Sequence, residues 1–463
     1  MKKHLLSATV GLALSAVTFT SSADDLAQIY QLAVQNDPAL LRAAAERDAA
    51  QKQVDIAESA FWPQLTGQAG YTESTRESYN FDDSSQSYYL ADSNTDGWDA
   101  SITLNQSIFD WSTWKQADIA EKQAYQAEVA YRDAAQSLML RVVNAYFGAL
   151  QAQDDLAFAE AEKRAIERQL EQTKQRFSVG LTAITDVHEA QAQYDSAVAA
   201  EIQAQNAVDI AFENIREITG QYPNQLAGLQ TQSFDPSKPT PEDVRQWVTK
   251  AENNNLSLMQ SMVAVDIAEQ RIKVEQSGHY PTVGLQASYS TGDSETEAEI
   301  PGFGTRTSNP PRLDNKSIGI SVNVPIFSGY RTTALTEQAR DNYVATSQTM
   351  VETRRTVERE TRNAFYDVTA SLSSIRAFEQ AVTSAESALK ATEAGFEVGT
   401  RTIVDVLNST RNLFNARRNL AEARYGYIRQ RLALEQAVGD LTPEDLQGIN
   451  AALSEQADGT AAD

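Results

Sequence analysis

Side chains that commonly perform catalysis or bind metals are sparse in this sequence of 463 residues. The chain has no cysteine, which excludes disulfides and thiolate metal sites. His188 and His279 have no partner at a metal-ligand spacing, and we interpret them as surface residues of a helix and of a strand end. No glycine-rich nucleotide fingerprint joins a predicted strand to a helix. We therefore expect no enzyme activity, no bound metal and no cofactor.

The first residues have the pattern of a secretory signal. A basic start is followed by an apolar run from Leu5 to Val17 and by a small-residue cleavage site at 21–23. The run falls short of the ~20 residues that a helix needs to cross hydrocarbon. We expect residues 1–23 to be removed as a signal peptide, so that the mature chain begins near Asp24.

The charge of the chain is strongly negative. The formal net charge is −24, or −26 without the two lysines of the signal. Such a surface repels phosphate backbones, so we expect no nucleic-acid partner. After the signal no run of about 18 apolar residues occurs, so entry into a membrane would require β-strands closed into a barrel.

One turn motif occurs twice in the chain, 219 positions apart. Residues 176–187 read RFSVGLTAITDV, and residues 395–406 read GFEVGTRTIVDV. A fixed spacing of this kind indicates an internal repeat. We predict two repeats, residues 24–230 and 231–440, each with a helix, two strands, a very long helix, a turn and a return helix.

Alternation of apolar and polar residues marks the predicted strands, as at Ile318, Ile320 and Val322. The polar connections at 72–97 and 291–316 are typical of exterior loops. The predicted ranges are strands 64–79 and 98–109, long helix 112–180 and return helix 185–220 in the first repeat, and strands 282–292 and 317–327, long helix 329–399 and return helix 401–439 in the second.

Aromatic residues gather at or just beyond the predicted strand ends, namely Trp62, Trp98, Phe109, Trp111 and Phe327. Such girdles lie at the headgroup level of a bilayer. The alternative is that these rings cap an ordinary core where strands meet helices. Each predicted strand has about the 9 to 11 residues that cross a bilayer at a tilt.

Four strands cannot close a barrel, because the smallest bacterial membrane barrels have about eight. Several chains must then share one barrel, as a dimer or a trimer. The long helices, at ~1.5 Å per residue, would each extend for ~100 Å, which points to coiled-coil assembly. A solid bundle and a hollow cylinder both remain compatible with their small apolar residues.

The two turn motifs, together with QSIFD at 106–110 and VPIFSG at 324–329, closely resemble the TolC family of outer-membrane efflux channels. The resemblance covers the mature chain to about residue 450. It implies an α+β membrane protein, a homotrimer in which four strands per chain build a 12-stranded β-barrel that a long α-helical coiled-coil barrel continues. The location implied is the outer membrane of a Gram-negative bacterium, in contact with its lipid and extending into the periplasm.

The resemblance also implies partners and a function. The duct would passively conduct drugs, small molecules or proteins in efflux or type I secretion, with an equatorial segment at Phe234–Lys250 and another at 441–463. Independently of the resemblance, the acidic composition from Leu453 to Asp463 predicts a disordered tail. An inner-membrane pump of the RND, ABC or MFS type and a periplasmic adaptor (membrane fusion) protein would dock at the turns. The implied adaptor contacts are Val179, Gly180, Leu181, Val398, Gly399 and Thr400.

A gate is implied at the same turns. Arg401 would reach Thr185 and Asp186 of a neighbouring coil, and Asp405 would point into the pore constriction. The chain departs from the family pattern twice, because Phe396 replaces a tyrosine of the gate links and Asn408 replaces a second pore carboxylate. We expect a looser closed state and weaker block by polyvalent cations.

The rival interpretation is a periplasmic coiled-coil adaptor or structural protein that never enters the membrane. It accounts for the long helices but leaves the four alternating strands and their aromatic ends without a role. The cargo range, the partner pump and the balance between efflux and secretion stay open, because a passive duct carries little selectivity.

Overall fold

The computed structural model describes residues 24–83, 86–230, 234–300, 304–451 and 453–454. The predicted signal peptide and residues 455–463 of the predicted tail lie outside the described residues. The chain divides into two compact units. We call the part made of residues 42–133 and 256–356 the sheet unit, and the remainder the hairpin unit.

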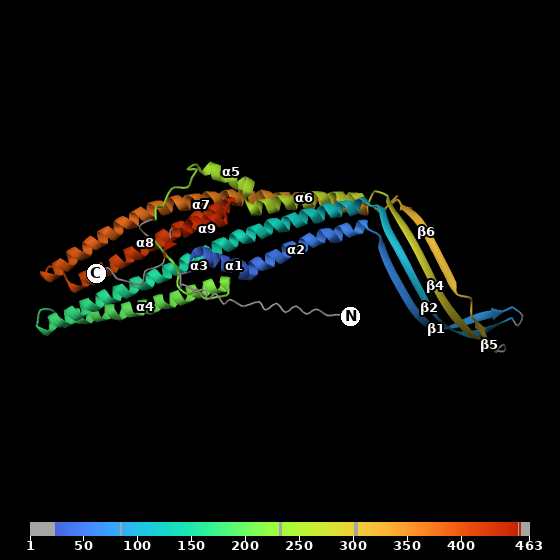
Figure 1. Ribbon diagram of the computed structural model, residues 1–463, viewed down its shortest axis with the longest axis horizontal. Helices are drawn as coiled ribbons and strands as arrows, with labels where there is room; N and C mark the ends of the chain where they lie inside the picture. Colours follow the sequence, from blue (N-terminus) through green and yellow to red (C-terminus); the bar gives the residue numbers. More distant parts are fainter. Residues whose placement is uncertain (1–23, 84–85, 231–233, 301–303, 452, 455–463) are drawn as a thin grey trace, which may run out of the picture. The chain divides into compact units, whose positions relative to one another are not determined.

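One antiparallel sheet dominates the sheet unit (Figure 1). Its strands are β1 (Gln64–Asp82), β2 (Ser87–Phe109), β4 (Thr282–Ile300), β5 (Gly304–Ser308) and β6 (Leu313–Asn323). β2 lies between β1 and β4, and β5 and β6 both pair with the other edge of β4. A register shift between Ser107 and Phe109 marks a bulge where β2 meets the helices.

The strands differ from the predicted ones at three places. Most of 72–97 and much of 291–316, predicted as loops, extend β1, β2 and β4, because ladder hydrogen bonds hold polar strands that have no apolar face. β6 ends at Asn323, although the alternation continues to Ile326. Pro325 explains that early end, because it lacks an N–H and restricts the residue before it.

Both edges of the sheet lack a partner within the described residues. β1 pairs only with β2, and β6 pairs only with β4. Every residue of β6 is exposed. The side chain of Ile318 has an exposed fraction of 78%. A long, apolar, unpaired edge of this kind requires another chain or a covering segment.

The helices of the described residues are α1 (Leu26–Asn36), α2 (Pro38–Glu58), the short η1 (Ser59–Phe61), α3 (Trp111–Ser178), α4 (Ile184–Thr219), α5 (Val244–Asn254), α6 (Leu256–Ser277), α7 (Arg331–Glu397), α8 (Ile403–Val438) and α9 (Pro443–Asn450). α3 and α7 have 68 and 67 residues. In the hairpin unit, α4 runs back beside the end of α3, and α8 beside the end of α7 (Figure 1). No helix of the described chain is both long and apolar enough to span a membrane.

The helix predicted at the start of the mature chain is interrupted at Asp37. Asp37 accepts a 2.8 Å hydrogen bond from the backbone N–H of Leu40 and a bidentate pair at 2.8 and 2.9 Å from Arg141. Burial raises the pKa of Asp37, but the hydrogen bonds from Arg141 and the backbone outweigh it and leave the pKa lowered. The interruption therefore starts α2 with a paired carboxylate and anchors it to α3 inside the hairpin unit.

A small second sheet joins distant parts of the hairpin unit. β3 (Gly228–Leu229) pairs antiparallel with β7 (Leu453–Ser454). The expectation of disorder from Leu453 onward is therefore wrong for these two residues, because the strand partner supplies hydrogen bonds that the sequence does not reveal. Within the segment expected to be equatorial, the indole N–H of Trp247 in α5 donates to the carbonyl of Pro241 at 2.7 Å.

Candidate functional site

Each of the two hairpin turns closes on the same backbone motif. After α3, the N–H of Leu181 donates to the carbonyl of Arg176 at 2.8 Å, and the N–H of Gly180 donates to that of Phe177 at 2.9 Å. Gly180 has a φ of +78°. This is a Schellman motif, in which glycine adopts the left-handed conformation at little cost.

The turn after α7 repeats this motif. Thr400 donates to Gly395 at 2.8 Å, Gly399 donates to Phe396 at 3.1 Å, and Gly399 has a φ of +81°. Both turns expose apolar side chains at the candidate adaptor contacts, because Val179, Leu181 and Val398 are largely open to solvent. Thr400 is exposed too, so the second turn is the more polar of the two.

Asp405, the candidate pore carboxylate, belongs to a capping box at the start of α8. Its Oδ2 accepts hydrogen bonds from the backbone N–H and the hydroxyl of Thr402, at 2.9 and 3.0 Å. Its own N–H donates to the Thr402 hydroxyl at 3.2 Å. These bonds from Thr402, and to a smaller extent the charge of Arg401, lower the pKa of Asp405.

Asp186 occupies the equivalent position of the first turn, and its surroundings differ. The residue that precedes α4 is Ala183, which has no side chain to cap the helix. Instead, the hydroxyl of Thr182 donates to Oδ2 of Asp186. Thr185, its neighbour, is exposed.

The candidate gate arginine, Arg401, lies against its own hairpin. The backbone N–H of Arg401 donates to the carbonyl of Gly395 at 3.2 Å. A Cβ at Gly395 would lie 2.7 Å from Cγ of Arg401. In the described part of this single chain, no hydrogen bond or ion pair joins Arg401 to Thr185 or Asp186. Asn408 accepts a 3.0 Å hydrogen bond from Arg411.

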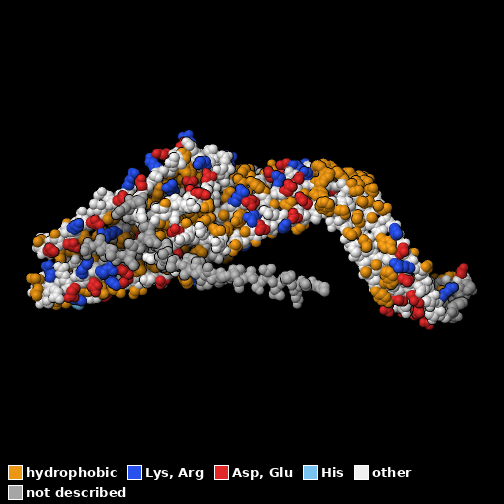
Figure 2. Space-filling model, in the orientation of Figure 1, with side chains coloured by type: hydrophobic (Ala, Val, Ile, Leu, Met, Phe, Trp, Pro, Cys, Tyr) orange, Lys and Arg blue, Asp and Glu red, His pale blue; other side chains and the backbone are white. Residues whose placement is uncertain are grey.

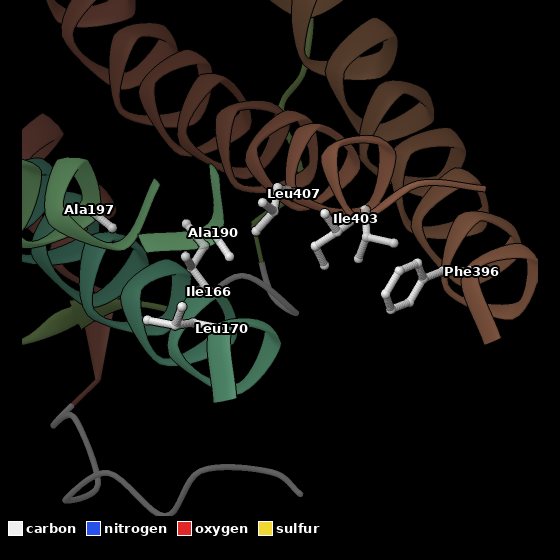
Figure 3. Packing of buried hydrophobic residues seen from close by; sticks show 8 residues of the cluster. Ile166, Leu170, Ala190, Ala197, Phe396, Ile403 and Leu407 are labelled. Atoms are coloured by element: carbon white, nitrogen blue, oxygen red, sulfur yellow. The ribbon is translucent and has the colours of Figure 1, made fainter. Parts of the chain in front are cut away.

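Phe396 lies in an apolar cluster that connects the two hairpins (Figure 3). The cluster contains Ile166, Leu170, Ala190, Ala197, Phe396, Ile403, Val406 and Leu407. The exposed fraction of Phe396 is 7%, and the guanidinium carbon of Arg176 lies 4.7 Å from its ring centroid. The equivalent residue of the first repeat, Phe177, is 42% exposed.

The aromatic residues near the predicted strand ends lie at two levels of the sheet unit, one at its helix end and one at Trp98. At the helix end, Phe109 and Trp111 each stack edge-on against Trp114, at 5.5 and 5.6 Å between ring centroids, and Phe327 stacks against Tyr330 at 5.6 Å. Trp62, at the same end, is exposed.

Trp98 was predicted at a strand end but lies in the middle of β2, opposite Tyr71, because the polar half of the strand continues beyond it. Eleven positions separate Trp98 from Phe109, or ~36 Å at ~3.3 Å per residue, close to the span of a tilted strand across ~30 Å of hydrocarbon. Exposed apolar residues lie between these levels, namely Leu65, Ile102, Ile108, Ile318, Ile320 and Val322. In Figure 2 hydrophobic side chains gather over the helix end of the sheet, and acidic ones beyond.

The family model described as outer membrane efflux protein matches residues 29–221 and 247–440, one segment in each repeat. The chain belongs to the outer membrane efflux protein family. Outer membrane protein TolC of Vibrio cholerae is 43% identical over 97% of this chain and 99% of its own length.

Two further known proteins resemble this chain at lower identity. Alkaline protease secretion protein AprF of Pseudomonas aeruginosa is 28% identical over 91% of this chain and 86% of its own length. The crystal structure of the Campylobacter jejuni CmeC outer membrane channel has a TM-score of 0.72 at 15% identity and covers 98% of each chain. The expected TolC-type family, its fold class and the outer-membrane location are thereby confirmed for this efflux protein.

Sequence reasoning missed two features of this efflux-protein site. The capping box has a sequence signature, because Thr402 precedes Asp405 by three positions. The contact between Arg176 and Phe396 has only an indirect signature in the sequence. The repeat alignment places Arg176 opposite Gly395, so only the first repeat has a large charged side chain at this position.

Proposed function

We propose that three copies of this chain form the passive exit duct of a tripartite efflux or type I secretion system, gated at the periplasmic hairpin turns. The observation that carries the proposal is the open sheet, whose band of exposed apolar residues is bounded by aromatic residues at bilayer spacing. Only other copies can pair both edges of this sheet in lipid, where unpaired backbone groups cost several kcal/mol each.

The partners in this proposal are a periplasmic adaptor protein and an inner-membrane pump of the RND, ABC or MFS type. The exposed apolar residues Val179, Leu181 and Val398 offer the adaptor a small apolar surface at each turn. Conduction through the duct is passive and requires no catalytic group. The name of the AprF relative supports protein secretion as a second cargo class beside small molecules.

Asp405 is proposed to contribute one carboxylate per chain to the pore constriction. The capping box uses Oδ2 of Asp405, whereas Oδ1 accepts no hydrogen bond within the described part of the chain. The carboxylate can therefore hold its place at the helix start and still face a cation. Asn408, one turn on, adds no charge to the ring.

Conductance of the purified mature protein in planar bilayers tests the proposal, with trivalent cations added on the periplasmic side. We expect discrete openings that these cations block, and weaker block for Asp405→Ala than for Asp186→Ala, the matched change in the first hairpin. Unchanged block in Asp405→Ala would remove Asp405 from the constriction. No conductance, together with a soluble monomer in detergent-free buffer, would favour the periplasmic adaptor interpretation.

A further inference from the structure

The register of the main sheet divides its side chains between two faces. Successive residues of a strand point to opposite faces, and directly paired residues of neighbouring strands share one. Trp98, Ile102 and Ile318 therefore lie on one face, which we call the apolar face. Ser288 and Ser317, which pair with each other, lie on the other face. The apolar face carries the band of exposed apolar residues, and so it is the face that meets lipid.

A lysine lies at the border of this band. Counted from the acidic end of the sheet toward the helix end, Lys316 is the last charged residue of the strands on the apolar face. It pairs directly with Tyr289, and its Nζ lies 5.6 Å from the centroid of the Tyr289 ring. The next residues of β6 on this face are Ile318, Ile320 and Val322. A lysine in such a place keeps its stem along apolar side chains and extends its ammonium toward the headgroups.

Arg312 lies at the level of Trp98, nearer the acidic end. Its guanidinium carbon is 5.6 Å from the centroid of the Trp98 ring, inside the ~6 Å range of cation–π contacts. Its Nε donates to the hydroxyl of Thr291 at 2.9 Å and lies 3.6 Å from Oδ1 of Asp314. We call Arg312 and Lys316 the basic pair. In the described part of the chain neither Nη of Arg312 nor the Nζ of Lys316 has a hydrogen bond, so these nitrogens can bind an oxyanion.

The other basic residues at this end of the sheet lie on the opposite face. Residues 72–97 and 291–316 contain four lysines and arginines, two of which form the basic pair. The other two are Arg76, which pairs with Ser93, and Arg306, which pairs with Ala298. Alternation along β2 and β4 puts both of these pairs on the face of Ser288. On the apolar face, the positive charge of this end therefore comes from the basic pair.

Carboxylates follow on the apolar face beyond Trp98. Asp293 and Asp314 lie beside Arg312 and offset part of its charge. Further out, two rows of carboxylates cross β1, β2 and β4, namely Glu73, Asp96 and Glu295, then Glu77, Asp92 and Glu299. An anion dissolved in water must pass these acidic rows, which repel it. An anion held in the bilayer reaches Lys316 without passing them, so the charge distribution favours a lipid over a dissolved ion.

We propose that the basic pair binds the phosphate of an anionic lipid headgroup in the outer leaflet of the membrane. The helices of this outer-membrane protein extend into the periplasm, which places the Trp98 end of the apolar band toward the exterior. Aromatic side chains mark the headgroup level, where lipid phosphates lie. Pairing of β6 with another copy leaves Arg312 and Lys316 on the apolar face, because side chains stand roughly perpendicular to the sheet. The inference rests on the outer-membrane location and not on conduction.

Lipid binding to the assembled mature protein tests the site. The probe is lipid A, which carries phosphate, and its reference is the same lipid after dephosphorylation. Native mass spectrometry of the detergent-solubilised trimer gives the dissociation constant of each. We expect Arg312→Gln and Lys316→Gln each to weaken lipid A binding roughly fivefold, the effect of one basic residue at a charged membrane surface, and the double variant to weaken it roughly 25-fold. The dephosphorylated lipid should not distinguish the double variant from the unmodified protein.

Matched controls come from the opposite face of the same sheet. Arg76→Gln and Arg306→Gln remove the same charge there and should leave lipid A binding unchanged. Excess inorganic phosphate should not displace lipid A, because the acidic rows repel a dissolved anion. Conductance of every variant should match that of the unmodified protein.

Unchanged binding in the double variant, or equal losses in the variants of the opposite face, would overturn the site. Displacement of lipid A by inorganic phosphate would assign the basic pair to dissolved anions instead. Binding that survives in the double variant but requires added Mg²⁺ would assign the lipid contact to the acidic rows. A double variant whose trimer dissociates at lower temperature in detergent without lipid would assign the basic pair to the interface between copies. Absence of channels in the unmodified protein would overturn the proposed function, whereas lipid A binding would still uphold this site.

Discussion

The first and second hairpins turn on the same backbone motif but surround it with different side chains. Gly180 and Gly399 take the same left-handed conformation and close equivalent hydrogen bonds. The second hairpin adds a capping box and a buried Phe396, whereas the first has an uncapped Ala183 and an exposed Phe177. Backbone geometry thus fixes the turn, and side chains decide how firmly each turn is tied to its neighbour.

The two hairpins should differ most in the stability lost when their equivalent phenylalanines, Phe177 and Phe396, are replaced. Phe396→Ala leaves a cavity in the cluster and should lower the free energy of unfolding by about 3 to 5 kcal/mol. Phe177→Ala removes a half-exposed ring and should lower it by under about 1 kcal/mol. Urea unfolding followed by helical circular dichroism measures both, and equal losses would contradict the asymmetry.

Substitution of the turn glycines should destabilise the two hairpins by equal amounts. Gly180→Ala and Gly399→Ala each place a Cβ on a left-handed residue, which costs about 1 to 2 kcal/mol. Gly148→Ala, inside α3 and with no atom near its added Cβ, should instead stabilise the helix by up to about 1 kcal/mol. Thermal melting of the three variants compares these effects, and a tolerated Gly180→Ala would show that the first turn relaxes.

The helix caps can be exchanged between the hairpins. Thr402→Ala removes the cap of α8 and should cost about 1 kcal/mol, and Ala183→Ser should give α4 a cap of similar value. Amide hydrogen exchange in the first turn of α4 and α8 reports each change locally. If Ala183→Ser does not slow amide exchange in α4, the hydrogen bond between Thr182 and Asp186 already stabilises the start of that helix.

The smallest effect is a pH dependence at Asp405. Its folded pKa lies below the ordinary value, so its contribution to stability is fully present above about pH 4 and is lost as the pH falls through the lowered folded value. Carboxyl ¹³C titration should show that Thr402→Ala moves the pKa of Asp405 upward, because the Thr402 hydroxyl bond is lost. An unmoved value would mean that the backbone bond alone sustains the shift.

Local and periodic features could be predicted from the sequence. The repeat, the turns at Gly180 and Gly399 and the membrane-facing alternation from Trp98 onward each have a signature in adjacent residues. The polar continuation of β2 up to Ser87 does not, because only its partners β1 and β4 hold it extended. The end of β6 before Pro325 and the break at Asp37 before Pro38 were readable from proline chemistry.

The candidate site divides in the same way. The capping role of Asp405 could be predicted, because Thr402 lies three positions before it in the sequence. The burial of Phe396 and the exposure of Phe177 do not follow from their identical residue type. They depend on which hairpin face meets Arg176, which lies more than 200 positions away from Phe396 in the chain.

The unpaired edges of β1 and β6 have a genetic consequence. A ring closes only if every edge finds its neighbour, so one copy with a damaged edge spoils the whole assembly. In a cell that makes sound and damaged chains in equal amounts, about one trimer in eight would contain sound copies alone. Edge mutations in this protein should therefore be dominant over sound chains made in the same cell.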